Sequence, residues 1–547
     1  MDTKRLLLFF VFSFSLVMLW ERYQAAEAPP APTTPAEVAS SVTAGAPSTA
    51  APAPLPAAPA QATPAAGGRL LSSRRIGVET DLFRAEIDEN GGDIRRLELL
   101  RHRAVGETAE PFLLLEDSAK PYVVQSGLTG AGLPNHRSVF SSDRDSYRLE
   151  DGQDTLVVRL TASSGDVELS RTYTFHRAQY VVDVALDARN GGAQPVTTSA
   201  YFQVLRHGDA PAGESQFQAT YTGPVVYNDA ERFRKVDFES VSKGKAEYAR
   251  SGTEGWVALI QHYFLTAWLP AAGLPRENYI DALADGIYRV GVKTPGSAIA
   301  PGETLSATMR LYAGPQEQDR LEALAPGLEL TTDYGWLTII AKPLFGFLSL
   351  LNELVDNWGL AIIILTLVVK ALFYPLSAAS YRSMAKMRVV APKLQQLKER
   401  YGEDKQRMQV ELMKLYQTEK INPLGGCLPI LVQIPVFIAL YYALIASVEL
   451  RHAPFYGWIV DLSAPDPYYV LPVLMGISMI VQARLNPPPP DPIQAKVMQI
   501  MPVAFSVFFF FFASGLVLYW LVNNVLSIAQ QWRINTVMER EKVTPKR

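Results

Sequence analysis

A single lysine interrupts the most apolar part of the sequence. The run Gly359–Val369 carries no charge, Lys370 follows it, and Ala371–Leu376 is largely apolar again. A charge inside a segment that can cross a bilayer costs about 3 kcal/mol on insertion scales, so it seldom faces lipid. Thr366 lies one helical turn before Lys370, on the same face. Two interpretations remain open: a cation lining a wet cavity in the membrane, or a lysine near a helix end that snorkels to the interface.

A second polar pattern falls in the last apolar segment. Its members, at i, i+3, i+4, i+7 and i+11, are Trp520, Asn523, Asn524, Ser527 and Gln531. Buried amides in a membrane usually bond to neighbouring helices, and that packing role is one explanation. Gln433 adds a polar group to another apolar segment. Polar groups on three segments favour the other explanation, a hydrophilic cavity between helices.

Composition excludes several kinds of chemistry. The chain has 547 residues and a net charge of −3, and its mean hydropathy of +0.06 averages a polar first half with an apolar second half. The one cysteine, Cys427, excludes an internal disulfide and cysteine-rich zinc sites. The six histidines show no HxxxH or HExxH spacing, so we expect neither a metal centre nor a cofactor.

The N-terminal 68 residues read as a membrane segment and a tether. Lys4 and Arg5 precede the apolar stretch Leu6–Trp20, which fits either a signal peptide or an uncleaved anchor over residues 1–24. Both interpretations send the following chain outward from the cytoplasm. Residues 25–68 are rich in Ala, Pro, Thr and Ser, so they cannot bury a core and predict a semi-extended tether.

Residues 69–330 predict one large β-domain. Alternating or β-branched runs, with Gly and Pro between them, indicate a mainly antiparallel β-sandwich. The clearest runs are Asp154–Ala162, Val167–Phe175, Tyr180–Asp187 and Ser306–Tyr312. Sandwiches of this size can bind sugars, and His102, His176 and His207 are candidate catalytic residues. Histidines without a spaced partner are more often ordinary packing or surface residues.

A junction over residues 331–356 separates this domain from the apolar half. Tyr334 and Trp336 suit a membrane interface, and Lys342, Pro343 and Glu353 break the apolar pattern. An amphipathic helix lying flat on the membrane fits better than a span, the alternative being a last helix of the β-domain.

A basic helical hairpin over residues 377–421 follows the first apolar span, 357–376. The helical patterns Tyr381–Arg400 and Glu403–Lys420 carry ten Lys or Arg and five acidic residues. The positive-inside rule makes this loop cytoplasmic. Its charge suits lipid head groups, RNA or an acidic partner, and equally a solvated loop.

The remaining apolar segments predict four more spans. These are residues 422–448, 468–483, 497–512 and 516–534, separated by a loop expected outside, 449–467, and a proline-rich cytoplasmic loop, 484–496. The last stretch, from Val497 to Trp532, is too long for one span, and a basic tail, 535–547, places the C-terminus in the cytoplasm. Both ends inside demand an even number, so we expect six spans, and the shortness of the last two implies a locally thinned bilayer.

These residues carry a specific resemblance over nearly the whole second half. The matching stretches, in order, are Asp333–Trp336, Ser383–Arg388, Asn422–Cys427, Gln433–Pro435, Leu440–Tyr442, Ser447–Arg451, Asp461–Ser463, Asp466–Tyr469 and Ser514–Tyr519. The chain resembles the bacterial YidC insertases of the Gram-negative type. The first half is similar in layout, with an anchor, a variable tether and a large periplasmic β-domain.

The resemblance implies a six-span α-helical membrane protein of the inner membrane with a periplasmic all-β super-sandwich domain. In that family the first segment is an uncleaved anchor, and the last five spans form a groove open to cytoplasm and lipid. Lys370 matches the groove arginine, Thr366 a groove threonine, and Trp520 stands where close relatives carry tyrosine. Arginine and lysine differ, because only a desolvated lysine readily loses its proton.

The family's activity is physical rather than covalent: it inserts and helps to fold membrane proteins, alone or beside the Sec translocon and its accessory subunits. Ribosomes deliver the nascent clients, with the hairpin and basic tail as expected contacts. The groove set is Lys370, Thr366, Gln433, Trp520, Asn523, Asn524 and Ser527. The client's apolar part is expected to slide along Ile430–Ile434 and Phe505–Phe509, with Ile430, Ile434, Phe505 and Phe509 facing lipid.

Two other classes compete with an insertase. A secondary transporter would use Lys370 and the amides to bind a small solute, but such proteins usually show internal repeats, and we find none. A tethered sugar-modifying enzyme would carry its essential activity in the β-domain.

Overall fold

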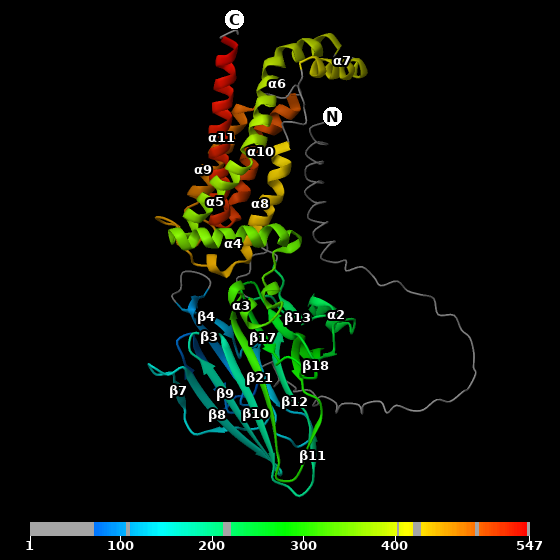
Figure 1. Cartoon of the computed structure of the whole chain (residues 1–547), viewed down its shortest axis with the longest axis vertical. Helices are drawn as coiled ribbons and strands as arrows, with labels where there is room; N and C mark the ends of the chain where they lie inside the picture. The colour runs from blue at the N-terminus through cyan, green and yellow to red at the C-terminus, as the bar shows by residue number, and fades with distance from the viewer. Residues whose placement is uncertain are drawn as a thin grey trace, which may run out of the picture.

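The computed structural model describes residues 70–104, 110–211, 220–401, 404–419, 428–486 and 492–543. The expected anchor, 1–24, and tether, 25–68, lie outside these residues. The described chain forms a β-domain and a helical part, joined end to end (Figure 1).

The β-domain consists of two large antiparallel sheets and a two-stranded ribbon. The first sheet has the order β15-β18-β19-β12-β5-β3-β2-β1-β7, with β4 beside β3, and the second the order β14-β13-β16-β17-β21-β10-β9-β8-β6. Strands β11 and β20 form the ribbon, and the pair β1–β7 is parallel. The strands are β1 Arg75–Glu79, β2 Phe83–Asp88, β3 Ile94–Arg103, β4 Pro111–Leu115, β5 Tyr122–Leu128, β6 Ser141–Ser142, β7 Ser146–Arg148, β8 Thr155–Ser164, β9 Val167–His176, β10 Val181–Asn190, β11 Val196–Thr198, β12 Ala200–His207, β13 Gly223–Asn228, β14 Arg232–Lys235, β15 Ser251–Gly252, β16 Trp256–Ile260, β17 Phe264–Leu269, β18 Arg276–Ala282, β19 Ile287–Lys293, β20 Ser297–Ile299 and β21 Thr304–Pro315.

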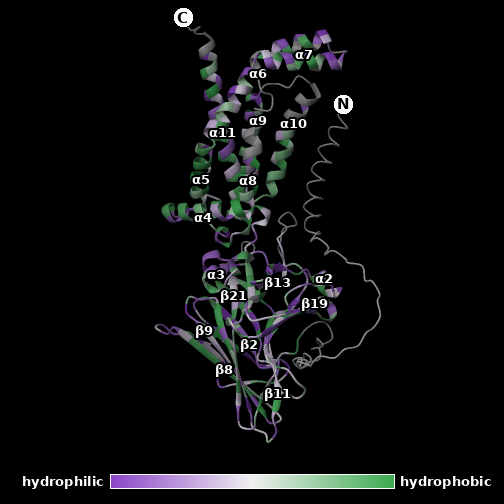
Figure 2. Ribbon diagram, turned by 45° about the vertical axis from the view of Figure 1, so that its right-hand side comes forward, coloured by the Kyte–Doolittle hydropathy of each residue, from purple (hydrophilic) through white to green (hydrophobic). Residues whose placement is uncertain are grey.

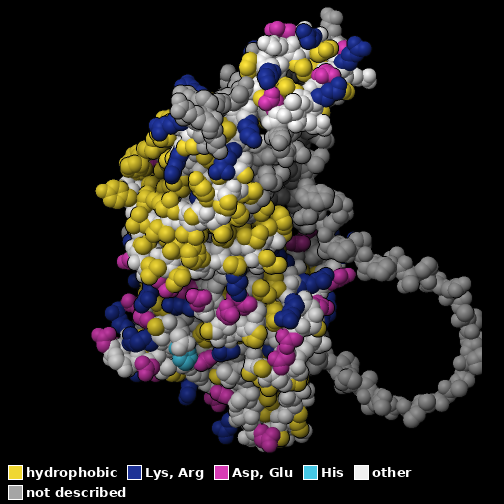
Figure 3. Space-filling view, turned by 45° about the horizontal axis from the view of Figure 1, so that its top comes forward, with side chains coloured by type: hydrophobic (Ala, Val, Ile, Leu, Met, Phe, Trp, Pro, Cys, Tyr) yellow, Lys and Arg dark blue, Asp and Glu magenta, His cyan; other side chains and the backbone are white. Residues whose placement is uncertain are grey.

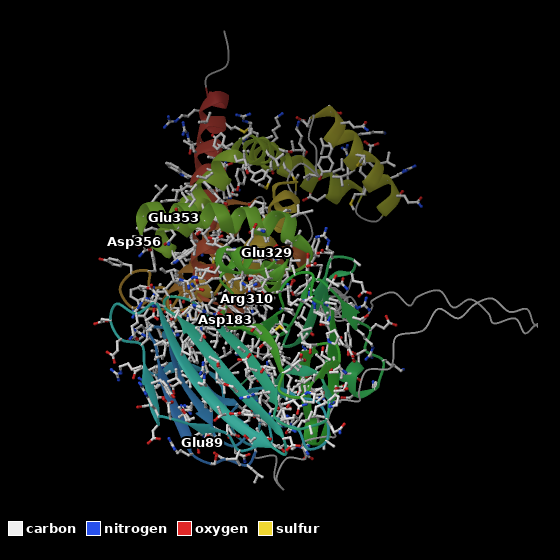
Figure 4. The ribbon with its side chains drawn as sticks, turned by 60° about the horizontal axis from the view of Figure 1, so that its bottom comes forward. Glu89, Asp183, Arg310, Glu329, Glu353 and Asp356 are labelled. Carbon is white, nitrogen blue, oxygen red and sulfur yellow. The ribbon has the colours of Figure 1, made fainter. Side chains whose placement is uncertain are left out.

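Alternation of side chains explains why the sheets stack. Along β10, Val182 and Val184 are buried, whereas Asp183 between them points outward and lies opposite Arg310 of β21 (Figure 4). Burying one face of each strand removes apolar surface from water at roughly 25 cal/mol per Å². The predicted all-β sandwich is confirmed, and its four clearest runs are β8, β9, β10 and β21.

The helical part follows a short junction, and its two longest helices are α6 and α11. The helices of the described chain are α2 Phe238–Ser242, α3 Gln318–Leu324, η1 Ala284–Gly286, η2 Leu328–Thr331, η3 Gly335–Leu337, α4 Thr338–Val355, α5 Trp358–Leu372, α6 Tyr374–Tyr401, α7 Lys405–Thr418, α8 Leu428–Ala446, η5 Val448–Leu450, α9 Val470–Leu485, α10 Pro492–Phe508, η6 Phe509–Phe511 and α11 Ser514–Val543. Helices α5, α8, α9, α10 and α11 form an apolar bundle, and α6 and α7 extend from it as the predicted hairpin (Figures 1 and 2).

Helix α4 runs across the bundle at the boundary with the β-domain (Figures 1 and 2). Its inner face buries Phe345 and Leu348, and its outer face leaves Ile339 and Leu354 exposed. Glu353 and Asp356 lie at its C-terminal end (Figure 4). Among the described residues, Gly335–Val355 is the one unbroken helix with the length and apolarity to cross a membrane.

The expected span over residues 357–376 is broken in the structure. Helix α5 ends at Leu372, and α6 starts at Tyr374 at an angle of 66° to it. The bent pair Trp358–Leu372 and Tyr374–Met387 is together long and apolar enough to cross a membrane. Helices α9 and α10 have 16 and 17 residues, so at 1.5 Å per residue they are about 24–26 Å long. A band of hydrophobic side chains covers this part of the surface, between charged ends (Figure 3).

Candidate functional site

The lysine on α5 faces the polar side of α11. The Lys370 ammonium donates to the Ser527 hydroxyl at 2.7 Å, and that hydroxyl donates to the Asn523 carbonyl at 2.7 Å. Lys370 has no carboxylate partner among the described residues. A neutral hydroxyl solvates the ammonium without cancelling its charge, so a net cation remains between the two helices.

Helix α8 adds a second polar contact. Gln433 donates from Nε2 to the side-chain oxygen of Asn523, and both side chains are partly buried. Beside them, Trp520 packs edge-on against Phe437 at 4.3 Å between ring centres. The buried Tyr519 side chain lies beside Gln433. This end of the cluster therefore combines amides with an aromatic wall.

Helix α9 supplies partners that the sequence analysis missed. Asn524 is 4% exposed and donates to the Ser478 hydroxyl at 2.8 Å. Gln531 donates to the Leu485 carbonyl at 3.1 Å and to Asn486 at 3.0 Å, satisfying acceptors at the end of α9. A serine in a short apolar helix gives a weak signal, because it bonds as readily to its own backbone.

Not every expected residue joins the cluster. Thr366 is buried on α5, and its hydroxyl donates to the Ile362 carbonyl at 2.7 Å, one turn back in the same helix. Tyr381, which is buried on α6, packs against Ile534 of α11 instead.

The expected client slide is only partly exposed. Ile434 on α8 and Phe505 on α10 are 45% and 43% exposed. Phe509 is buried and packs against Trp520 at 5.1 Å between ring centres, because the chain turns into η6 there. Ile430 falls in α8, and its side chain lies outside the described ones.

The three candidate histidines of the β-domain have separate partners. His176 pairs with Asp183 at 2.8 Å, His207 lies 3.6 Å from Asp209, and His102 shares a hydrogen bond with the hydroxyl of Tyr180. Burial, followed by the charge of Arg451, lowers the pKa of His102 to about 4. No group of three metal-binding side chains occurs among the described residues. This arrangement offers no shared catalytic centre.

The fold and the cluster define a class: an apolar helical bundle that holds an uncompensated cation and paired amides, attached to a β-sandwich. Two family models match the chain, the YidC periplasmic domain over residues 75–347 and the 60Kd inner membrane protein over residues 350–542. The chain belongs to the YidC family of membrane protein insertases, which are inner-membrane proteins with a periplasmic domain and not enzymes.

Similar proteins cover the full chain. The membrane protein insertase YidC of Methylobacillus flagellatus is 53% identical over 544 residues, 99% of this chain and 98% of its own. That of Aromatoleum aromaticum is 51% identical over 545 residues, 99% of each chain. A crystal structure of an active YidC insertase with its first transmembrane domain resolved covers 84% of this chain and 93% of its own, at 19% identity and a TM-score of 0.39. The chain accordingly inserts membrane proteins and acts on nascent clients.

Proposed function

We propose that clients enter through a hydrophilic groove between α5, α8, α9 and α11, open to the cytoplasm and to lipid. The observation that carries this proposal is the polar cluster of Lys370, Ser527, Asn523, Gln433, Asn524 and Ser478, which spans four otherwise apolar helices. Packing alone rarely needs polar groups on so many helices, since each costs free energy when buried.

The cluster suits exchange of partners. Every hydrogen bond in it joins neutral groups or a cation to a neutral group, so an entering polar flank can replace one partner without separating an ion pair. An acidic flank gains more, because a carboxylate facing Lys370 adds charge attraction in a partly dehydrated space. The apolar part of the client then lies along Ile434 and Phe505 toward lipid.

The proposed topology has six spans. The anchor over residues 1–24 is followed by α5, α8, α9, α10 and α11, and α4 lies flat on the outer surface with Ile339 and Leu354 in the lipid head-group region. Helices α5, α9 and α10, at about 22–26 Å, are shorter than a hydrocarbon core of about 30 Å, which supports a locally thinned bilayer. The membrane potential then assists an acidic flank outward.

The cytoplasmic contacts follow from charge. We assign both termini to the cytoplasm, and the hairpin of α6 and α7 and the basic tail to the ribosome. The Sec translocon and its accessory subunits are the expected partners within the membrane. Figure 3 shows Lys and Arg side chains at the hairpin end, with some Asp and Glu among them, and ribosomal RNA would supply charge opposite to the basic ones.

Reconstitution tests the groove directly. Purified protein in liposomes should insert a short single-span client with an acidic flank faster than empty liposomes do. Crosslinks from a photoreactive group at position 523 should reach the client during insertion. Insertion without any crosslink from positions 523, 527 or 433 would contradict the groove.

A further inference from the structure

One loop lies between the β-domain and the helical bundle. We call residues Ser447–Asp466, which join α8 to α9, the floor loop. On the bundle side, Ser514 donates from its backbone to Ala464 at 2.7 Å, and Gly515 donates to Leu462 at 2.9 Å. Both contacts hold the turn before α11. The floor loop is thus the outer cover of the bundle.

The start of α5 is tied to the same loop. Asn357 donates from its side-chain amide to the Phe455 carbonyl at 3.0 Å. Gly359 follows, and a Cβ atom there would lie 2.0 Å from the Phe455 ring. Only glycine admits this close approach, so the floor loop packs directly against the backbone of the helix that carries Lys370.

The opposite side of the floor loop packs against the β-domain, and we call this boundary the seat. Val448 belongs to the hydrophobic core of the sandwich, although it lies more than 130 residues after the last strand. The ring of His262 donates to the Ile445 carbonyl at 3.0 Å, and the Tyr263 hydroxyl bonds with Ser463. These contacts join the two parts of the protein at their boundary.

Arg451 makes the most unusual contact of the seat. Its guanidinium carbon lies 5.2 Å from the ring centre of Phe112 and 5.4 Å from that of Phe264, with Tyr263 at 6.0 Å. Phe112 and Phe264 are themselves stacked at 3.9 Å. Phe112 comes from the first sheet and Phe264 from the second, so the Arg451 side chain contacts both layers of the sandwich.

We call the three rings around Arg451, those of Phe112, Tyr263 and Phe264, the aromatic cage, and this contact exists only while the β-domain is in place. The Nη1 and Nη2 atoms of Arg451 are buried without a hydrogen-bond partner among the described residues. The titratable groups that act on it are Tyr263 of the β-domain and Asp461 of its own loop, and its own charge acts on the partly buried His102 of β3. A buried guanidinium is costly unless aromatic faces stabilise it, so Arg451 favours this loop position only while the β-domain is seated.

We propose that the β-domain holds the floor loop closed over the outer end of the bundle, and that Arg451 is the positioning residue through which it does so. The inference rests on the proposed function in one respect only, that the space which the floor loop closes off is the proposed groove. Loss of the cage frees the floor loop from the sandwich, and the turn before α11 becomes accessible from the periplasm.

Thiol labelling measures that accessibility. In full-length protein carrying Cys427→Ser and Ala513→Cys, a membrane-impermeant maleimide is added to the outside of spheroplasts. Ala513 is 5% exposed and faces Pro465 of the floor loop, so slow labelling is expected. Arg451→Met, which keeps length but not charge, should label about tenfold faster, the change that about 1.4 kcal/mol produces in an opening equilibrium.

Three further variants keep the test specific. Arg451→Lys retains a cation for the aromatic faces and should restore most of the protection. Phe112→Leu weakens the cage from the β-domain side and should raise labelling as Arg451→Met does. Arg144→Ala removes a similar contact with Tyr147 inside the β-domain, where the arginine is 70% exposed, and should change nothing.

The outcomes separate this inference from the groove. Wild-type labelling rates in both Arg451→Met and Phe112→Leu, at matched protein levels and melting temperatures, overturn it. Equal acceleration by Arg451→Lys and Arg451→Met also overturns it, because charge would then be irrelevant. If substitutions at Lys370 leave insertion unchanged while Arg451→Met still accelerates labelling, the groove is contradicted and the inference about the floor loop is supported.

Discussion

Lys370 and Ser527 lie 157 positions apart in the sequence, yet the ammonium of the first donates to the hydroxyl of the second at 2.7 Å. The contact connects the first helix of the apolar bundle to the last. Because Ser527 is neutral, the pair keeps its positive charge, which distinguishes it from a structural ion pair and makes charge the quantity to vary.

Lys370→Arg should retain insertion of a client with an acidic flank, and Lys370→Glu should lose it. Lys370→Ala should slow that client most, with little effect on a neutral-flank client. The reason is that attraction between two charges about 4 Å apart is only about 1 kcal/mol in water and larger where water is partly excluded. Insertion of both clients is measured at matched protein levels.

The control for charge reversal is Lys243→Glu, an exposed lysine of the β-domain that pairs with Glu239. It should insert both clients normally. Equal activity of Lys370→Glu and wild type on the acidic-flank client would falsify the charged-groove mechanism and leave a snorkelling lysine as the explanation.

Asn524 and Ser478 should be energetically coupled. Asn524→Ala and Ser478→Ala each break the 2.8 Å bond between α11 and α9, and the double variant should lose less than the two single losses combined. Hydrogen bonds of this kind in membranes average about 0.6 kcal/mol, so a small coupling is expected in unfolding from mild detergent. Additive losses would show that the bond contributes nothing.

Removing the hairpin after its packed base should abolish client capture. Tyr381 and Met384 of α6 pack with Ile534 and Met538 of α11, so a deletion that begins at Arg388 and ends at Thr418 spares these contacts. The truncated protein should keep its thermal unfolding temperature but fail to insert clients. The control replaces the same segment with a flexible linker of equal net charge. Normal insertion by the deletion variant would refute the prediction.

Most of the β-domain should be dispensable for insertion, because the polar cluster lies entirely after it. An in-frame deletion of Leu70–Gln318 should support growth of cells depleted of the wild-type protein. The seat described above adds a condition: the deletion removes Phe112 and Phe264 and exposes Val448 and Arg451. We therefore expect lower abundance, improved by Val448→Ser. Failure to grow at normal membrane levels favours a function within the β-domain.

Glu449 in η5 should make the seat sensitive to pH. Burial raises the pKa of this carboxyl to about 7, with Glu317 and Asp319 adding repulsion and Tyr334 nearby. A raised folded-state pKa gives stability that is complete below about pH 4.5 and lost as the pH rises to about 7. Glu449→Gln should be more stable than wild type at pH 8, by at most about 3 kcal/mol, and equal to it at pH 4.5.

The measurement is the thermal unfolding temperature of the full-length pair across this pH range. Only the difference between the variants is interpreted, because the protein also contains His102 and His262, whose pKa values are lowered to about 4. These two histidines make the folded protein less stable as the pH falls, which is opposite to the effect of Glu449. Glu239→Gln, on an exposed helix, controls for charge removal. A variant difference that does not change with pH contradicts the assignment.

The sequence by itself determined the elements and the polar faces. Strict alternation predicts β8, β9 and β10, because burying one side of a strand has a period of two. The spacing of Asn523, Asn524, Ser527 and Gln531 predicts one polar face of α11, because helical period alone decides it. The charge of Lys370 within an apolar run is also visible in the sequence, because its free-energy cost in hydrocarbon depends on the composition around it.

Only the tertiary structure decided which groups meet. Ser478 on α9 pairs with Asn524, Thr366 turns back to its own helix, and Phe509 enters the core because η6 redirects the chain. The cage of Arg451 joins residues more than 180 positions apart. No local pattern encodes such contacts, because they depend on how two domains dock, and docking is set by packing over the whole boundary.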